Sequence, residues 1–128
     1  MNKSTLLTIL LISAICLLAD AVSGSWIANM GTLASVVLSI LFAANVRRQF
    51  GSEADEARVS CLVNAIVSGA GLLSGHSLGL FSFPHGLLGF VPGLIHALQF
   101  FVNVGFGIWQ TVAWNKLRNS SRAAAASA

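Results

Sequence analysis

Four long apolar runs divide the chain and constrain its fold more than any other feature. They comprise residues 5–22, 26–46, 59–81 and 87–114. None of them contains Lys or Arg, and Asp20 is the only acidic residue in any of them. Each run reaches the ~18 residues that an α-helix needs to cross the hydrocarbon core of a bilayer. The pattern predicts four transmembrane helices.

The composition favours a membrane-embedded chain over a soluble domain. Of the 128 residues, 55% are hydrophobic and 9% are charged, whereas soluble domains carry about 25% charged residues. A β-barrel would need alternating segments of roughly ten residues, and these runs instead repeat small residues at helical spacing. We therefore predict an all-α fold: one polytopic membrane domain, residues 1–128, with four transmembrane helices in an antiparallel bundle and residues 117–128 as a flexible tail.

The cations predict how this bundle is oriented. They lie in the N-terminus, between the second and third runs, and in the C-terminal segment: Lys3, Arg47, Arg48, Arg58, Lys116, Arg118 and Arg122. Residues 23–25 and 82–86 contain none. By the positive-inside rule, both termini and the second connection are cytoplasmic. We expect a cell membrane, in a bacterium the inner membrane, and we attribute the net charge of +3 to orientation and not to nucleic-acid binding.

The first 21 residues permit a second interpretation. Lys3, the following apolar run and an Ala-Asp-Ala sequence at residues 19–21 are also typical of a cleaved signal peptide. Cleavage after Ala21 would leave four residues before Trp26, which favours a retained helix. The orientation of the other three helices is the same in both interpretations.

Small residues recur at every fourth position on both sides of Pro84. They are Gly71, Gly75 and Gly79 before it, and Gly89, Gly93 and Ala97 after it. Such stripes let helix backbones approach closely in lipid. Each glycine or alanine has a counterpart at the same distance from Pro84, so an antiparallel hairpin would bring them together in register. We predict this hairpin within one chain; the alternative is that the stripes contact a second copy.

The histidines, His76, His85 and His96, raise the question of a haem or metal site. His76 follows Gly75 and His96 precedes Ala97, so the two side chains point to opposite sides of the hairpin if the small-residue faces meet. We therefore expect no cofactor and no metal. Ligation through other helices or a second copy is the alternative. Cys16 and Cys61 differ in depth by on the order of 10 Å and are not expected to form a disulfide.

Polar residues form a seam on each predicted helix. In the fourth run they fall on one face, at His96, Gln99, Asn103 and Gln110, and Asn64 is the amide of the third run. Hydrogen bonds between helices would explain this seam, at about 0.6–2 kcal/mol per contact. A hydrated path is the alternative. Asp20 is expected near the outer surface, where an acid costs little.

The sequence contains no motif that brings a nucleophile together with a base, such as GxSxG or HExxH. We predict a non-enzymatic accessory or assembly subunit that acts through helix contacts with another membrane protein or with itself. The first alternative is a small oligomeric channel, transporter or holin-like pore. A haem- or metal-binding membrane protein is the second.

Overall fold

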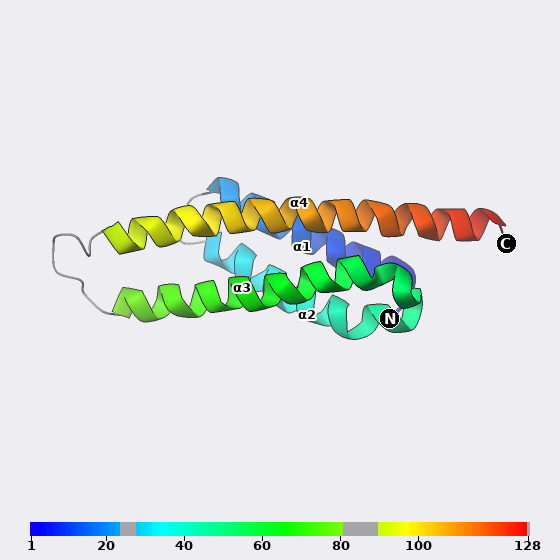
Figure 1. Ribbon diagram of the computed structural model, residues 1–128, viewed down its shortest axis with the longest axis horizontal. Helices are drawn as coiled ribbons and strands as arrows, with labels where there is room; N and C mark the ends of the chain where they lie inside the picture. The colour runs from blue at the N-terminus through cyan, green and yellow to red at the C-terminus, as the bar shows by residue number, and fades with distance from the viewer. Residues whose placement is uncertain (24–27, 81–89, 128) are drawn as a thin grey trace.

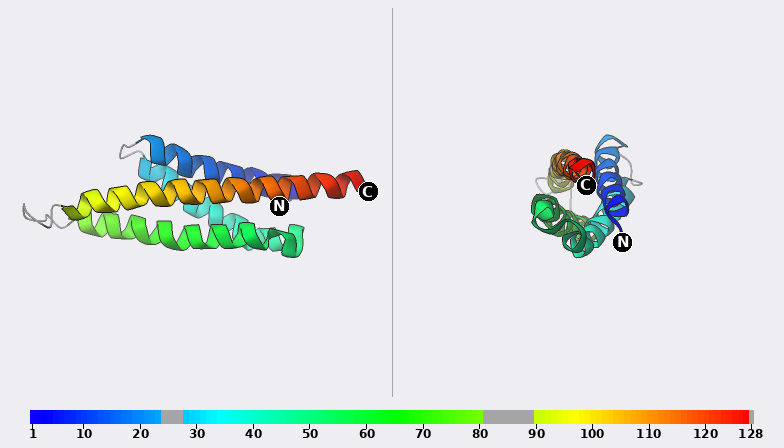
Figure 2. Two further views of the ribbon diagram at one scale, coloured as in Figure 1. Left: turned by 45° about the horizontal axis from the view of Figure 1, so that its top comes forward. Right: turned by 90° about the vertical axis from the view of Figure 1, so that its right-hand side faces the viewer.

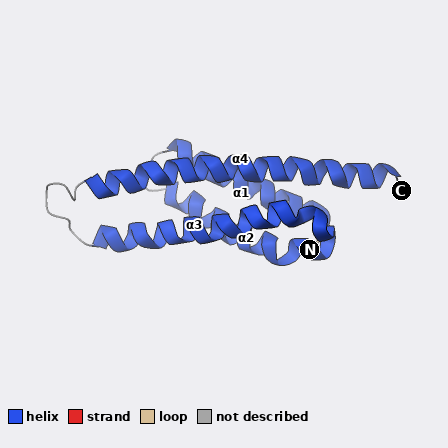
Figure 3. Ribbon diagram, in the orientation of Figure 1, coloured by secondary structure: helices blue, strands red, loops and turns tan. Residues whose placement is uncertain are grey.

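The computed structural model describes residues 1–23, 28–80 and 90–127, and every secondary-structure element in them is a helix (Figures 1 and 3). The elements are α1 (Lys3–Ser23), α2 (Ala28–Phe50), the 3₁₀ helix η1 (Gly51–Ala54), α3 (Asp55–Leu80) and α4 (Phe90–Ser127). The predicted all-α fold is confirmed for this part of the chain.

The helices run alternately in opposite directions and pack as a bundle. Each packs against two neighbours, in the order α1, α2, α3, α4 and back to α1. The N-terminus, η1 and the C-terminus lie at one end, as two views agree (Figures 1 and 2). All seven cations therefore belong to segments at or near the same end of the bundle.

Gly51 is the first residue of η1 and allows the sharp turn that follows α2. Its φ of +62° is the only positive φ in the described residues, and glycine adopts this conformation without the steric penalty of a Cβ atom. Asp55 and Glu56 follow in the first turn of α3, where acidic side chains interact favourably with the helix dipole.

The C-terminal end of α4 differs from the prediction. Residues 117–128 were expected to be a flexible tail, but α4 continues as a helix to Ser127. Leu117 is buried at 3% exposure, Ser120 donates a hydrogen bond of 2.8 Å to Glu53, and the alanines that follow have the highest helix propensity of any residue. With 38 residues, α4 is about 57 Å long and extends past the neighbouring helices at the C-terminal end (Figure 1).

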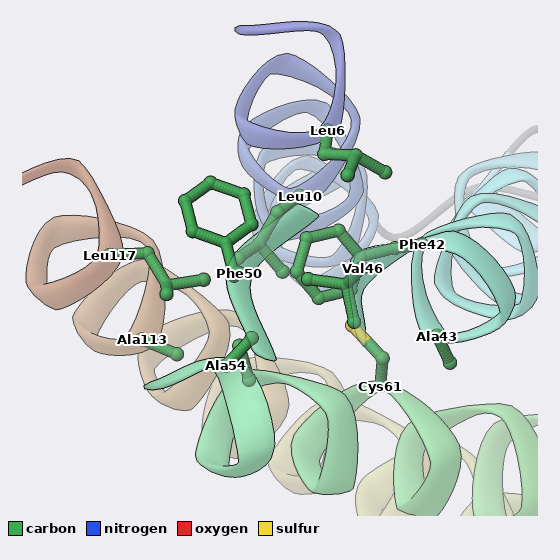
Figure 4. Packing of buried hydrophobic residues seen from close by; sticks show 11 residues of the cluster. Leu6, Leu10, Phe42, Ala43, Val46, Phe50, Ala54, Cys61, Ala113 and Leu117 are labelled. Carbon is green, nitrogen blue, oxygen red and sulfur yellow. The ribbon is translucent and has the colours of Figure 1, made fainter. Parts of the chain in front are cut away.

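An apolar core fills the end of the bundle near the termini (Figure 4). Phe42, Val46 and Leu10 are fully buried there, and α1, α2, η1, α3 and α4 all contribute. The complete cluster is Leu6, Leu10, Phe42, Ala43, Val46, Phe50, Ala54, Ala57, Cys61, Ala113 and Leu117.

Charged side chains surround this core at the same end. Lys3 lies 5.3 Å from the ring centre of Phe50, and Arg118 lies 4.5 Å from that of Trp114. Such contacts contribute about 0.5–1 kcal/mol each at exposed sites. Lys116 pairs with Glu56 at 3.0 Å, but both side chains are exposed, so the pair adds little to stability.

Two helical stretches of the described residues are apolar enough and long enough to cross a membrane, judged by length and composition. They are Lys3–Val22 and Met30–Leu73, the second of which passes through α2 and η1 into α3. The finer prediction of four transmembrane helices goes beyond this finding and stays a prediction.

Candidate functional site: a buried polar seam

The bundle interior beyond the apolar core is rich in polar side chains. Ten polar side chains are buried in the described residues, and most of them are completely inaccessible: Ser13, Asp20, Thr32, Ser35, Ser39, Ser60, Asn64, Ser68, Asn103 and Gln110. Nine of the ten, all except Ser60, are joined by hydrogen bonds into two groups. We call them the central cluster (Ser13, Ser35, Ser39, Asn64, Ser68 and Gln110) and the outer cluster (Asp20, Thr32 and Asn103, with the half-buried Gln99).

In the central cluster, Gln110 connects α4 to α1 and α2. Ser13 donates a hydrogen bond of 2.8 Å to Gln110 Oε1, and Gln110 Nε2 donates one of 3.1 Å to Ser39. The hydroxyl of Ser13 also lies 3.0 Å from that of Ser35 and 3.2 Å from that of Ser39. Three helices therefore share one set of hydrogen bonds.

Asn64 adds α3 to the same cluster. Its Nδ2 atom donates to the hydroxyls of Ser35 and Ser39, both at 3.0 Å. Its Oδ1 atom accepts a hydrogen bond of 2.8 Å from Ser68, one helical turn away. Because Ser35 and Ser39 are four residues apart, they lie on one face of α2, and a single amide can reach both.

The outer cluster joins α1, α2 and α4. Thr32 donates a hydrogen bond to Asp20 Oδ2. Asn103 Nδ2 donates to the same oxygen at 3.1 Å and to Thr32 Oγ1 at 3.2 Å. Gln99 Nε2, one turn along α4, donates to Asn103 Oδ1 at 3.2 Å.

Gly31 permits the close packing beside this cluster. A Cβ atom at Gly31 would lie 2.9 Å from the carbonyl oxygen of Cys16 and 3.2 Å from Asp20 Cβ. The first distance is shorter than such contacts in real structures, and the atom it meets is backbone. Glycine at this position therefore allows α2 to lie against α1 with Thr32 at the carboxyl group.

The predicted seam residues that the structure describes all lie in these two clusters: Asn64, Gln99, Asn103 and Gln110. The side chain of His96 lies outside the described side chains, as do those of His76 and His85. No three His, Cys, Asp or Glu residues in the described part of the chain are grouped so that they could hold a metal ion.

Of the small residues that mirror one another about Pro84, the structure describes the surroundings of the two farthest from it, Gly71 and Ala97. A Cβ atom at Gly71 would lie 2.8 Å from Oε1 of Gln99, whereas its expected counterpart, Ala97, is exposed. At this level α4 thus presents Gln99 to α3. The remaining members are Gly75, Gly79 and Gly93, whose surroundings are not described, and Gly89, which lies outside the described residues. Their register stays a prediction.

Two features of the site were not predicted from the sequence. Asp20 was expected at the outer end of its helix, a depth that stays a prediction; what the sequence did not indicate is that its side chain is 7% exposed and lies between helices. Thr32, its hydroxyl partner, was not identified as a seam residue. Its spacing of three and seven residues from Ser35 and Ser39 is the signal that places all three on one face of α2.

The exterior of α4 carries an apolar groove of about 310 Å³ lined by Phe101, Val102, Gly105, Phe106 and Trp109. The rings of Phe106 and Trp109 stack with their centres 5.9 Å apart. A Cβ atom at Gly105 would meet no atom within 4 Å, so the groove is open at this glycine. We call it the α4 groove.

Comparisons with protein-family models, with curated proteins and with solved structures found no match to this chain.

Proposed function

We propose that the chain is a non-enzymatic membrane protein with four transmembrane helices, which acts as an accessory or assembly subunit through contacts between helices. The proposed location is the cell membrane, with both termini in the cytoplasm. The observation that carries the proposal is the reversed distribution of polarity beyond the apolar core, with amides and hydroxyls inside the bundle and large apolar side chains outside.

The reversal is pronounced at the level of single residues. Asn64 and Gln110 have no exposed surface, whereas Ile66, Leu73 and Phe101 are 71%, 73% and 69% exposed. In water, each exposed apolar side chain would forgo about 25 cal/mol per Å² of burial. In a bilayer the same side chains contact lipid, and buried polar groups are tolerated because they bond to one another. A lipid environment therefore fits this surface better than water.

The proposed topology follows from the arrangement of the termini and η1 at one end. In a variant without Cys16 and Cys61, a cysteine at Ser52 in η1 and one at Ser82 should react with an impermeant maleimide from opposite sides of the membrane. The Ser52 cysteine should react only after the cytoplasmic side is opened. Reaction of both positions from the same side would contradict the four-helix topology.

The hydrogen bonds of the central cluster favour a role in helix contacts over a pore. A pore would present its amides to water, but the Nδ2 and Oδ1 atoms of Asn64 and the Nε2 and Oε1 atoms of Gln110 all bond to side chains of the bundle. With its interior occupied in this way, the protein acts on other molecules through its exterior.

The α4 groove is the proposed contact for one transmembrane helix of another membrane protein. It lies within the fourth apolar run, at the depth where the proposed topology places lipid chains and helices, and the open position at Gly105 offers the close backbone approach on which helix association in lipid depends. The proposal predicts a partner that co-purifies at fixed stoichiometry from gently solubilised native membranes.

Gly105→Leu should reduce the amount of this partner at least about tenfold, because the leucine side chain would occupy the groove, while its Cβ atom would meet no atom of the chain within 4 Å. Gly69→Leu is the matched control, since a Cβ atom at Gly69 on α3 also meets nothing within 4 Å. Retention of the partner by Gly105→Leu would exclude the groove. Absence of any stoichiometric partner, or recovery of only a second copy of the chain, would contradict the assembly role with another protein.

A further inference from the structure

The end of the bundle that carries the two termini has an excess of positive charge. It has seven cations and three acids, Glu53, Asp55 and Glu56. Within the described residues, Lys116 is the only cation in an ion pair, and its partner is Glu56. Arg118 lies two positions from Lys116 on α4 and has no acidic partner in the same residues. The proposed contact at the α4 groove does not use this charge.

The guanidinium group of Arg118 is held in place by two neighbours on its own helix. Its central carbon lies 4.5 Å from the ring centre of Trp114, one turn earlier, and Nη2 donates a hydrogen bond of 3.2 Å to Oδ1 of Asn115. Nε is buried and has no hydrogen-bond partner in the described residues. A guanidinium group fixed in this way loses little rotamer freedom when an anion binds, and its planar donors match the oxygens of a phosphate group.

Arg118 lies on the side of α4 that faces away from the acids. Glu56 pairs with Lys116, and Glu53 accepts a hydrogen bond from Ser120. Each of these two α4 residues is two positions from Arg118, or about 200° around the helix. The acids that contact α4 therefore leave the charge of Arg118 in place. Because Arg118 is only half-buried, an anion can approach it from outside the bundle.

The first turn of α1 brings a second cation to the same level. Leu6 of α1 and Leu117 of α4 are buried in one apolar cluster, and the two helices run in opposite directions (Figure 1). Lys3 therefore lies within about one helical turn of Arg118 along the bundle axis. Its ammonium group lies beside the ring of Phe50 and has no acidic partner in the described residues. Two adjacent helices thus carry unpaired positive charge at one level.

The proposed topology places Arg118 in the headgroup layer of the cytoplasmic leaflet. The fourth apolar run ends at Trp114, and Arg118 follows four residues later, about 6 Å along the helix. The polar layer of a bilayer is about 5–8 Å thick on each side, and indole rings favour its boundary with the hydrocarbon core. Arg122, about 12 Å beyond Trp114, lies outside this layer.

We infer that the guanidinium group of Arg118, held against Trp114, binds the phosphate of an anionic phospholipid headgroup, and that Lys3 adds to the attraction. The inference rests on the proposed membrane location and topology. Charge complementarity selects this class of lipid, because a zwitterionic headgroup carries a cation of its own, which the positive charge at this end of the bundle repels. The site is separate from the α4 groove, which is proposed to take a helix.

The fluorescence of Trp114 tests the inference. In the full chain with Trp26→Phe and Trp109→Phe, Trp114 is the only indole, and lipids with bromine atoms near the start of their acyl chains quench it on contact. We expect brominated phosphatidylglycerol in phosphatidylcholine vesicles to quench Trp114 more than the same fraction of brominated phosphatidylcholine. The apparent affinity for phosphatidylglycerol should be about fivefold higher, the effect of one basic side chain at an anionic surface.

Arg118→Gln in this background should reduce the preference about fivefold, to near equality of the two lipids. Arg122→Gln is the charge-matched control, since it removes the same charge from a position outside the headgroup layer, and it should leave most of the preference in place. Equal losses in the two variants would indicate a diffuse attraction to net charge and would overturn the site at Arg118. Circular dichroism in the same vesicles checks that both variants are folded.

The comparison of the two lipids before Arg118 is replaced does not depend on a folded variant. If both lipids quench Trp114 equally, the inference fails and the proposed function stands, because quenching by either lipid still places α4 in the bilayer. If neither lipid quenches Trp114, the proposed membrane location is contradicted and the inference fails with it.

Discussion

Replacement of Gly31 by alanine is expected to lower the free energy of unfolding by about 1–3 kcal/mol, the usual effect of overpacking a tight interior. The added Cβ atom would lie 2.9 Å from the carbonyl oxygen of Cys16. This oxygen is part of the α1 backbone, so it cannot move aside as the end of a side chain can. Unfolding of the purified protein in mixed micelles, followed by circular dichroism, measures the change.

Gly69→Ala is the matched control for Gly31→Ala. No atom lies within 4 Å of the position that its Cβ would take, and alanine is about 1 kcal/mol more favourable than glycine inside a helix. The two variants should therefore change stability in opposite directions. If Gly31→Ala were as stable as Gly69→Ala, the close approach of α1 and α2 at Cys16 would be wrong.

The helices could be predicted from the sequence because the length and hydrophobicity of an apolar run are properties of that segment alone and do not depend on its neighbours in the fold. All four apolar runs overlap the helices that the structure describes, although α4 extends past its run. The C-terminal extension escaped prediction because residues 117–128, apart from Leu117, are polar or small and continue no apolar run. Their alanines favour helix, and Leu117 anchors the preceding turn in the core.

The sequence predicts which face of a helix carries the polar residues, but not which of these residues form hydrogen bonds with one another. Spacing places Gln99 and Asn103 on one side of α4, yet it does not fix the rotation and axial offset of a neighbouring helix. These two quantities decide that Asn103 reaches Asp20 and Thr32. The burial of Asp20 depends on the same offsets, and its position near the end of the first run gave no indication of it.

The glycine pattern illustrates the same limit. The symmetry about Pro84 identified six small residues, of which Gly71 has a close neighbour in the described residues, but it missed two other close contacts, at Gly31 and Gly107. A Cβ atom at Gly107 would lie 2.7 Å from two side-chain atoms of Leu18. A repeat of small residues shows where close packing is possible. Which helix packs there depends on the arrangement of all four helices.

Replacement of Asn64 by leucine is expected to destabilise the bundle by about 2 kcal/mol, because it removes three hydrogen bonds that contribute about 0.6–2 kcal/mol each and are not additive. Ser35 and Ser39 keep their contacts with Ser13, which limits the loss. The free energy of unfolding in mixed micelles is again the measurement.

Asn45→Leu is the matched control for Asn64→Leu. Within the described residues, the side chain of Asn45 bonds to the carbonyl oxygen of Leu41 on its own helix and to no other helix, so this substitution should change stability by less than about 0.5 kcal/mol. The comparison also separates the two functional hypotheses. In a bundle held by its seam, Asn64→Leu weakens the fold and leaves vesicles as tight to ions and small solutes as before. In a pore, leucine at this position would leave the fold intact and change a measurable solute flux. A solute flux that is altered by Asn64→Leu and not by Asn45→Leu would contradict the accessory role and support a pore. The reason is that a side chain that lines water contributes little to helix association.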